Sequence, residues 1–115
     1  MVLAEYLPVY KASYDMTLAL FHVIKKYPKE FKYTLGEQMK KDSLALIATI
    51  YKANSILERK TIIIEARGHL ESVRVLLRLS KDLHTIPLDK FVDINGSLET
   101  ISKQLTARNR SIKSM

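Results

Sequence analysis

Apolar side chains recur along this chain at the three- and four-residue spacing of an α-helix. The three prolines punctuate these periodic segments and only three glycines are present, so helices joined by short turns are favoured over strands. We expect helices over about residues 8–27, 34–57, 60–83 and 87–106. Four helices with short connections predict an all-α fold, an up-down-up-down four-helix bundle, in one domain over residues 1–115.

Local signals set the predicted helix ends. Pro8 suits the first turn of a helix, and Pro28 marks the end of that helix because the residue before a proline avoids the α region. Thr34 and Glu37 have the spacing of a capping box, in which each side chain satisfies the other's free backbone donor. Asp42 falls on the apolar face of the second helix, so we expect it to be either partly exposed or paired.

Three of the predicted helices each have one apolar stripe that should face the core. The stripes comprise Tyr10, Tyr14, Thr17, Phe21 and Ile24, widened by Met16, Leu20 and Val23, in the first helix; Leu35, Met39, Leu46, Ile50, Ala53 and Leu57 in the second; and Phe91, Ile94, Leu98, Ile101 and Leu105 in the fourth.

The third predicted helix combines a narrow basic stripe with apolar surface on both flanks. The stripe holds Arg67, Arg74, Arg78 and Lys81, with Glu71 among them. Leu70, Val73 and Leu77 lie on one flank, Val75 and Leu79 on the other, and Leu76 and Leu83 lie opposite. A helix that is apolar over so much of its circumference should be buried on more than one side. We therefore predict a subunit interface at Val75, Leu76, Leu79 and Leu83.

The net charge of +7 favours a polyanionic partner, because clustered cations release the counterions condensed on a phosphate backbone. The basic stripe is either a solvated charged face or a ridge that binds phosphate or carboxylate, for which the planar fork of arginine is well suited. A flexible basic tail is expected over residues 108–115, where Arg108 and Arg110 follow the last acidic residue, Glu99.

A second basic cluster surrounds the first predicted turn. It contains Lys25, Lys26, Lys29, Lys32, Lys40 and Lys41, interleaved with Tyr27, Phe31 and Tyr33. Such a mixture can stack bases and hold phosphates, as single-strand binders do. Alternatively, the aromatic rings close the end of the bundle and the lysines only keep it soluble.

Other chemistries find little support in the sequence. The absence of cysteine excludes a disulfide or a thiolate metal site. The sequence also has no Glu-x-x-His pair of the kind that builds a di-metal centre, so we expect no metal and no cofactor. No apolar run approaches the ~18 residues of a membrane span, and the N-terminus lacks a secretory signal, so we expect a cytoplasmic protein. Arg78 and His84 have the spacing of the HEPN ribonuclease motif, although His84 also suits a cap at the helix C-terminus.

Four segments resemble the Avd family, the accessory variability determinants of diversity-generating retroelements. They are Leu7 to Asp15, Phe31 to Glu37, Leu79 to Leu83 and Ser102 to Thr106. The family is related to four-helix-bundle proteins encoded within intervening sequences of 23S ribosomal RNA. The resemblance implies a barrel-shaped homopentamer with a basic surface, which binds a reverse transcriptase and nucleic acid and supports mutagenic retrohoming.

The leading interpretation is a non-enzymatic homo-oligomer that holds a reverse transcriptase together with RNA or cDNA. The residues expected to bind nucleic acid or the partner are Arg67, Arg74, Arg78, Lys81, Lys25, Lys26, Lys29, Lys32, Lys40, Lys41, Arg108 and Arg110. Two alternatives remain open at this point. One is an orphan bundle that binds RNA or scaffolds another protein, and the other is a HEPN-type ribonuclease that uses Arg78 and His84.

Overall fold

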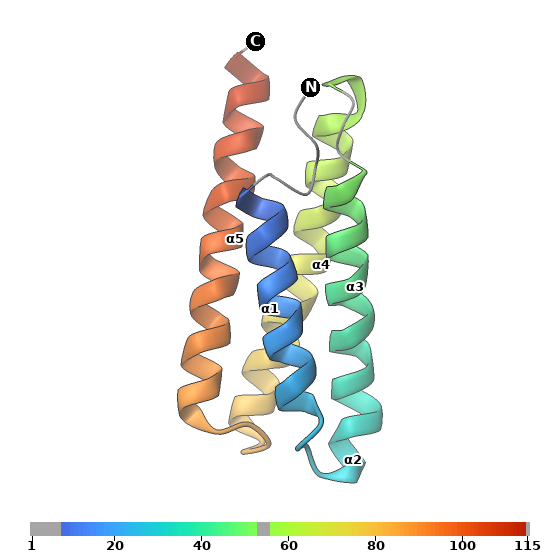
Figure 1. Cartoon of the computed structure of the whole chain (residues 1–115), viewed down its shortest axis with the longest axis vertical. Helices are drawn as coiled ribbons and strands as arrows, with labels where there is room; N and C mark the ends of the chain where they lie inside the picture. Colours follow the sequence, from blue (N-terminus) through green and yellow to red (C-terminus); the bar gives the residue numbers. More distant parts are fainter. Residues whose placement is uncertain (1–7, 53–55, 115) are drawn as a thin grey trace.

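The structure is a computed structural model that describes the backbone of residues 8–52 and 56–114 and the side chains of residues 8–52 and 60–107. This part of the chain forms four long helical segments and no strand, which confirms the predicted all-α class (Figure 1). The elements are α1 (Pro8–Ile24), α2 (Lys29–Phe31), the π-helical turn η2 (Lys32–Gly36), α3 (Glu37–Tyr51), α4 (Ile56–Asp82) and α5 (Leu88–Ser114). Because α2, η2 and α3 follow one another without a break, they make up the second long segment.

The four segments run alternately up and down, as predicted for a four-helix bundle (Figure 1). Each packs against two neighbours, in the order α1, α3, α4, α5 and back to α1. The bundle measures 46 × 20 × 19 Å, and its length matches a 27-residue helix, which spans about 40 Å at 1.5 Å per residue. The α1–α2 turn and the α4–α5 turn lie together at one end, which we call the turn end (Figure 1).

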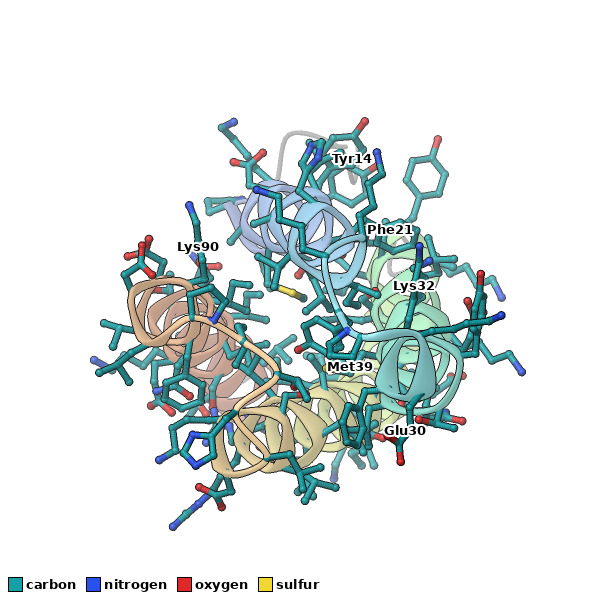
Figure 2. All side chains as sticks on the ribbon, turned by 90° about the horizontal axis from the view of Figure 1, so that it is seen from below. Tyr14, Phe21, Glu30, Lys32, Met39 and Lys90 are labelled. Atoms are coloured by element: carbon teal, nitrogen blue, oxygen red, sulfur yellow. The ribbon has the colours of Figure 1, made fainter. Side chains whose placement is uncertain are left out.

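Apolar side chains from all four segments fill the centre of the bundle. In α5, Ile94, Leu98, Ile101 and Leu105 are buried and Phe91 packs against them, so the stripe predicted for this helix is confirmed. In the second segment Met39, Leu46 and Ile50 are buried as predicted, and Met39 points into the bundle (Figure 2). The predicted core positions Ala53 and Leu57 lie outside the described side chains.

The core face of α1 is rotated relative to the predicted stripe. Tyr14 is 47% exposed, whereas Val9 and Ser13 are buried. Ser13 fits the core because its hydroxyl donates a hydrogen bond of 2.7 Å to the Val9 carbonyl, which satisfies the polar group within the helix. The ring of Tyr10 lies 6.1 Å from that of Tyr14 and 5.9 Å from that of Tyr51, so these tyrosines sit at the α1–α3 edge.

The predicted capping box at Thr34 and Glu37 is wrong, because the second helical segment begins at Lys29. The Pro28 carbonyl accepts hydrogen bonds from the amides of Phe31 and Lys32, at 2.9 and 2.8 Å. Thr34 therefore lies inside the helix, where its hydroxyl donates to the Glu30 carbonyl. Pro28 both follows one helix and precedes the next, and the sequence interpretation used only the first role.

The π-helical turn η2 brings the second segment close to α1. A Cβ placed on Gly36 would lie 2.7 Å from Cγ2 of Ile24, closer than ordinary carbon contacts. Glycine at this position therefore allows the two helices to pack at their observed separation.

The remaining helix ends also differ from the predicted ones. The helix α1 ends at Ile24, before a turn at residues 25–27. The helix α4 already begins at Ile56, and α5 continues to Ser114, beyond the end predicted near residue 106. No proline or glycine follows Gly96, so no helix-breaking residue stops α5 earlier.

Candidate nucleic-acid and partner surfaces

The side chain of Arg67 crosses from α4 to α5. Its guanidinium donates hydrogen bonds to the Ser102 hydroxyl at 3.2 Å, the Ser102 carbonyl at 3.1 Å and the Thr106 hydroxyl at 2.8 Å. Arg67 therefore makes three hydrogen bonds within its own subunit. Its main role is to join α4 to α5.

Two more cations of the predicted stripe also contact α5. Arg74 lies 3.2 Å from the Glu99 carboxylate, with the Glu71 carboxylate 3.9 Å from its Nε, and its side chain is only 30% exposed. The Nζ of Lys81 lies 5.1 Å from the ring centroid of Phe91, a cation–π contact. At Arg67, Arg74 and Lys81, the predicted basic stripe therefore lies in the contact between α4 and α5. We call this contact the seam.

Arg78 differs from the other three cations of the stripe. It is exposed, and the described residues provide it with no ion-pair or hydrogen-bond partner. Of the four cations, Arg78 is therefore the one best placed to bind an external anion.

The lysines around the first turn fall into two groups. Lys25, Lys26, Lys29 and Lys41 are exposed. Lys40 pairs with Glu37 at 3.7 Å and lies 5.4 Å from the Phe21 ring centroid, while Lys32 lies 5.9 Å from the Tyr33 ring centroid. The first group keeps its charge available, whereas Lys40 is partly engaged with its own subunit.

The interleaved aromatic residues also serve different roles. Tyr27 is buried and Phe31 packs against the core, so both close the end of the bundle, as one of the two sequence interpretations predicts. Burial raises the pKa of the Tyr27 phenol, and the nearby hydroxyls of Ser80 and Thr85 oppose this rise. Tyr33 is 59% exposed and leaves its ring free to contact a ligand.

The helix α4 ends in a Schellman motif centred on His84. The amide of His84 donates to the Lys81 carbonyl and that of Thr85 to the Ser80 carbonyl, both at 3.0 Å. His84 has a φ of 60°, the left-handed conformation that glycine usually supplies at this position. His84 therefore lies at the C-terminus of α4, as predicted, whereas a favourable interaction of its side-chain charge with the helix end stays a prediction.

A cleft of about 880 Å³ opens beside this motif at the turn end. We call it the turn-end cleft; its lining includes His22, Lys25, Lys26, His84, Lys90 and Asp93. Sequence reasoning missed this site, because His22 and Lys90 belong to helices far apart in the chain. Arg78 does not line the cleft, so the cleft does not unite the two residues of the HEPN-like spacing.

Asp42 is paired, as one of its two predicted alternatives requires. The Ser72 hydroxyl donates to its carboxylate at 2.6 Å, Gln38 donates at 3.2 Å, and Nδ1 of His69 lies 3.9 Å away. His69 also lies 3.9 Å from the Glu65 carboxylate. This cluster joins α3 to α4. Within the described residues, no group of three or more His, Cys, Asp or Glu could hold a metal ion.

An apolar ridge runs along the outer side of α4. Val75 is 64% exposed and Leu79 41%, while Leu83, just after the helix, is 43% exposed. Ile64, which the sequence interpretation missed, is 64% exposed and lies on the same side of the helix. Leu76 instead packs partly against its own core. We define the α4 ridge as Ile64, Val75, Leu79 and Leu83.

A second exposed apolar surface lies on α1 and α3. It includes Tyr14, Leu18, Leu44 and Tyr51, and we call it the α1–α3 surface. Figure 2 shows Tyr14 on the side of α1 that is nearer to α3. The subunit therefore carries exposed apolar side chains both on α4 and on the α1–α3 pair of helices.

A family model described as bAvd-like matches residues 7–112 of the chain. A comparison with curated proteins found no match. Arg108 and Arg110 fall within this range and within α5, but their side chains lie outside the described ones. Across the described residues, no helix is both long and apolar enough to cross a membrane.

Proposed function

The chain belongs to the bAvd-like family, of an accessory and non-catalytic type linked to diversity-generating retroelements, and we propose that it binds a reverse transcriptase and nucleic acid in support of mutagenic retrohoming. The observation that carries the nucleic-acid part is the set of exposed cations at the turn end. Lys25, Lys26 and Lys29 lie there, and the residues with described side chains provide no ion-pair partner for them. Such cations gain free energy by displacing counterions from phosphates.

Phosphate contacts of this kind give affinity without reading a base sequence. Specificity for one RNA or cDNA would therefore come from the reverse transcriptase or from the shape of the RNA. The accessory protein would increase the time that enzyme and template spend together.

We further propose that the subunit assembles into a ring, with the α4 ridge of one copy against the α1–α3 surface of the next. Two different surfaces in contact form a heterologous interface, which closes into a ring when the rotation between subunits allows it. The resemblance to Avd proteins suggests five subunits. A ring repeats each exposed cation once per subunit, so modest contacts combine into high avidity.

The ribonuclease alternative gains no support from the arrangement of its two residues. His84 belongs to a helix-terminating motif and lines the turn-end cleft, whereas Arg78 lies outside it. If the chain were such an enzyme, His84→Ala would abolish RNA cleavage and leave RNA binding intact. Under our proposal, purified wild type and variant show the same absence of cleavage.

The proposal is tested by measuring binding to a structured RNA over a series of salt concentrations. We expect the logarithm of the affinity to fall linearly with the logarithm of salt concentration. Arg78→Glu should weaken binding without unfolding the bundle. Arg74→Glu is unsuitable for this purpose, because it would place a third carboxylate beside Glu71 and Glu99. Binding that does not depend on salt contradicts the proposal.

Partner binding and assembly need separate measurements. The reverse transcriptase should co-purify with the chain, and nuclease treatment shows whether the two proteins touch directly or through nucleic acid. Light scattering should give about five times the 13.2 kDa mass of the subunit, and Val75→Glu on the α4 ridge should lower that mass. Its matched control is Thr100→Glu, which makes the same change of charge at an exposed position on α5 outside both apolar surfaces. A monomeric wild type contradicts the ring.

A further inference from the structure

The turn-end cleft has the size and apolar lining of a small-molecule site. Its volume of about 880 Å³ falls within the range of pockets that hold organic ligands. Val23 on α1, Ile86 in the α4–α5 turn and Ile94 on α5 contribute apolar side chains to it. Three separate segments thus meet around one cavity, whose apolar lining offers a surface for a flat, poorly hydrated group.

Lysines surround this apolar lining. Lys25, Lys26 and Lys90 line the cleft, and Asp93 is the single acidic residue among the lining residues. None of the three lysines has an ion-pair partner in the part of the chain whose side chains are described. Three lysines against one acid leave an excess of positive charge at the cleft, which favours the binding of an anion. Figure 2 looks onto this end of the bundle and labels Lys90.

Two imidazole rings complete the site. His22 comes from the last turn of α1, and His84 comes from the α4–α5 turn. The backbone hydrogen bonds of the Schellman motif fix the position of His84 relative to α4. Histidine rings can stack on bases and also exchange hydrogen bonds with their edges.

We propose that the turn-end cleft binds a nucleotide, with its base against the apolar lining and the histidine rings and its phosphate at Lys25, Lys26 and Lys90. The nucleotide is either free or the 5′-phosphorylated end of a strand. A simple anion would leave the apolar lining and both rings unused. The inference rests on the proposed nucleic-acid binding, which it deepens by assigning one nucleotide to a defined site.

The three histidines of the chain provide a direct readout. Adenosine 5′-monophosphate, titrated into the full-length protein, should shift the ring-proton NMR signals of His22 and His84. His69 serves as an internal control, because it contacts Asp42 in the α3–α4 cluster and does not line the cleft. Inorganic phosphate should bind at least about tenfold more weakly than the nucleotide, because it contacts only the lysines.

A variant that fills the cleft separates the shape of the site from its charge. Ala19 is exposed and lines the cleft, so Ala19→Trp should occupy the space of the base without altering any charge. We expect nucleotide affinity to fall about tenfold. Ala107→Trp is the matched control, since Ala107 is exposed on α5 outside the cleft and outside both apolar surfaces, and it should leave the affinity unchanged.

A second pair of variants tests the lysines independently, in case Ala19→Trp perturbs folding. Lys26→Glu should abolish the shift of the His22 and His84 signals, whereas Lys103→Glu, with the same change of charge at an exposed position on α5 outside the cleft, should preserve it. Equal loss in both variants would show that only the net charge matters and would overturn the inference. Equal affinities for inorganic phosphate and nucleotide would also overturn the inference, as would shifted NMR signals for all three histidines.

A 5′-phosphorylated oligonucleotide distinguishes the two sources of the nucleotide. If this oligonucleotide shifts the NMR signals of His22 and His84 and its 5′-hydroxyl counterpart does not, the cleft holds a strand end. If only the mononucleotide shifts these signals, the cleft holds a free nucleotide. Structured-RNA binding by the same samples separates the two proposals. RNA binding without any nucleotide response removes this inference alone, and nucleotide binding without RNA binding removes the proposed function alone.

Discussion

Arg67 on α4 and Lys25 in the α1–α2 turn contribute equally to the charge of the chain, yet their surroundings differ. Arg67 donates three hydrogen bonds to Ser102 and Thr106 and is half-buried between α4 and α5. Lys25 is exposed at the rim of a cleft, with no ion-pair partner among the described side chains. The first cation stabilises the fold and the second remains available to a ligand.

The difference shows that the number of cations does not measure the charge that a partner encounters. Residues of α5 face the stripe on α4 along its length, with Ser102 opposite Arg67, Glu99 opposite Arg74 and Phe91 opposite Lys81. At the turn end, the cleft brings Lys25, Lys26 and Lys90 together with only one acid. Substitutions in the α4–α5 seam should therefore change stability, whereas substitutions at the turn end should change binding.

The largest expected effect is on stability, at the seam. Arg67→Met keeps much of the apolar stem but removes the hydrogen bonds to Ser102 and Thr106. We expect the free energy of unfolding to fall by about 2 kcal/mol, because bonds to a charged group are worth about 1.5–3 kcal/mol and this site is partly solvated. Urea denaturation measures the change.

The same variant should bind structured RNA with the affinity and salt dependence of wild type. The comparison is made under conditions in which both proteins are folded. A lower salt slope for Arg67→Met would mean that the seam contacts phosphates and would remove the distinction between the two regions. Ser102→Ala is a useful companion, since it deletes one partner of Arg67 and no cation.

The next effect is on binding, at the turn end. Lys25→Glu combined with Lys26→Glu should lower RNA affinity by about tenfold or more, because two phosphate contacts are replaced by repulsion. The free energy of unfolding should change by less than about 0.5 kcal/mol, as is usual for exposed positions. Unaltered RNA affinity in a folded double variant would place the binding surface elsewhere.

The sequence predicted the parts of this molecule that depend on local periodicity. The α5 stripe from Phe91 to Leu105 was correct because one face of that helix is continuously apolar. Tyr14 was misplaced because an amphipathic tyrosine satisfies the same spacing at the edge of a core as within it. The start at Lys29 was missed because a single proline ends one helix and begins another.

The sequence could not predict which cations lie in the seam and which lie free at the turn end. Arg67 meets Ser102 across 35 positions of chain, and their contact depends on the axial register of α4 against α5. The turn-end cleft similarly requires that the α1–α2 and α4–α5 turns lie at the same end of the bundle. Charge and periodicity identified the cations, but packing decided which of them stay free.

A smaller effect should arise at the turn that forms one wall of the cleft. His84 has a φ of 60°, a conformation that costs a residue with a Cβ about 1–2 kcal/mol relative to the right-handed region. His84→Gly and His84→Ala both remove the imidazole, but only glycine also removes this strain. We expect the glycine variant to be about 1 kcal/mol more stable than the alanine variant in thermal or urea unfolding. Equal stabilities would contradict a strained backbone at this position.

The smallest effect concerns Tyr27, which closes the turn end beneath the free lysines. Its hydroxyl is buried near the hydroxyls of Ser80 and Thr85, but none of the described residues makes a hydrogen bond of good geometry with it, so Tyr27→Phe should leave stability near pH 8 unchanged or raise it by less than about 1 kcal/mol. Because burial raises the pKa of this phenol, the folded state keeps its proton above pH 10, where the unfolded chain loses it. The contribution of the protonated Tyr27 phenol to the free energy of unfolding is therefore complete below about pH 10. It declines as the pH rises towards the pKa of the folded state.

The wild type should accordingly lose stability relative to Tyr27→Phe as the pH rises above about 10, by at most about 1.4 kcal/mol per pH unit. Urea unfolding of both proteins from pH 8 to pH 11 measures this difference, and the comparison cancels the titration of the lysines and of the other tyrosines. Parallel pH profiles would mean that the Tyr27 phenol ionises as readily in the folded protein as in the unfolded chain. Water would then reach the ring from the cleft side, and the turn end would be more open than the packing of Tyr27 against α4 implies.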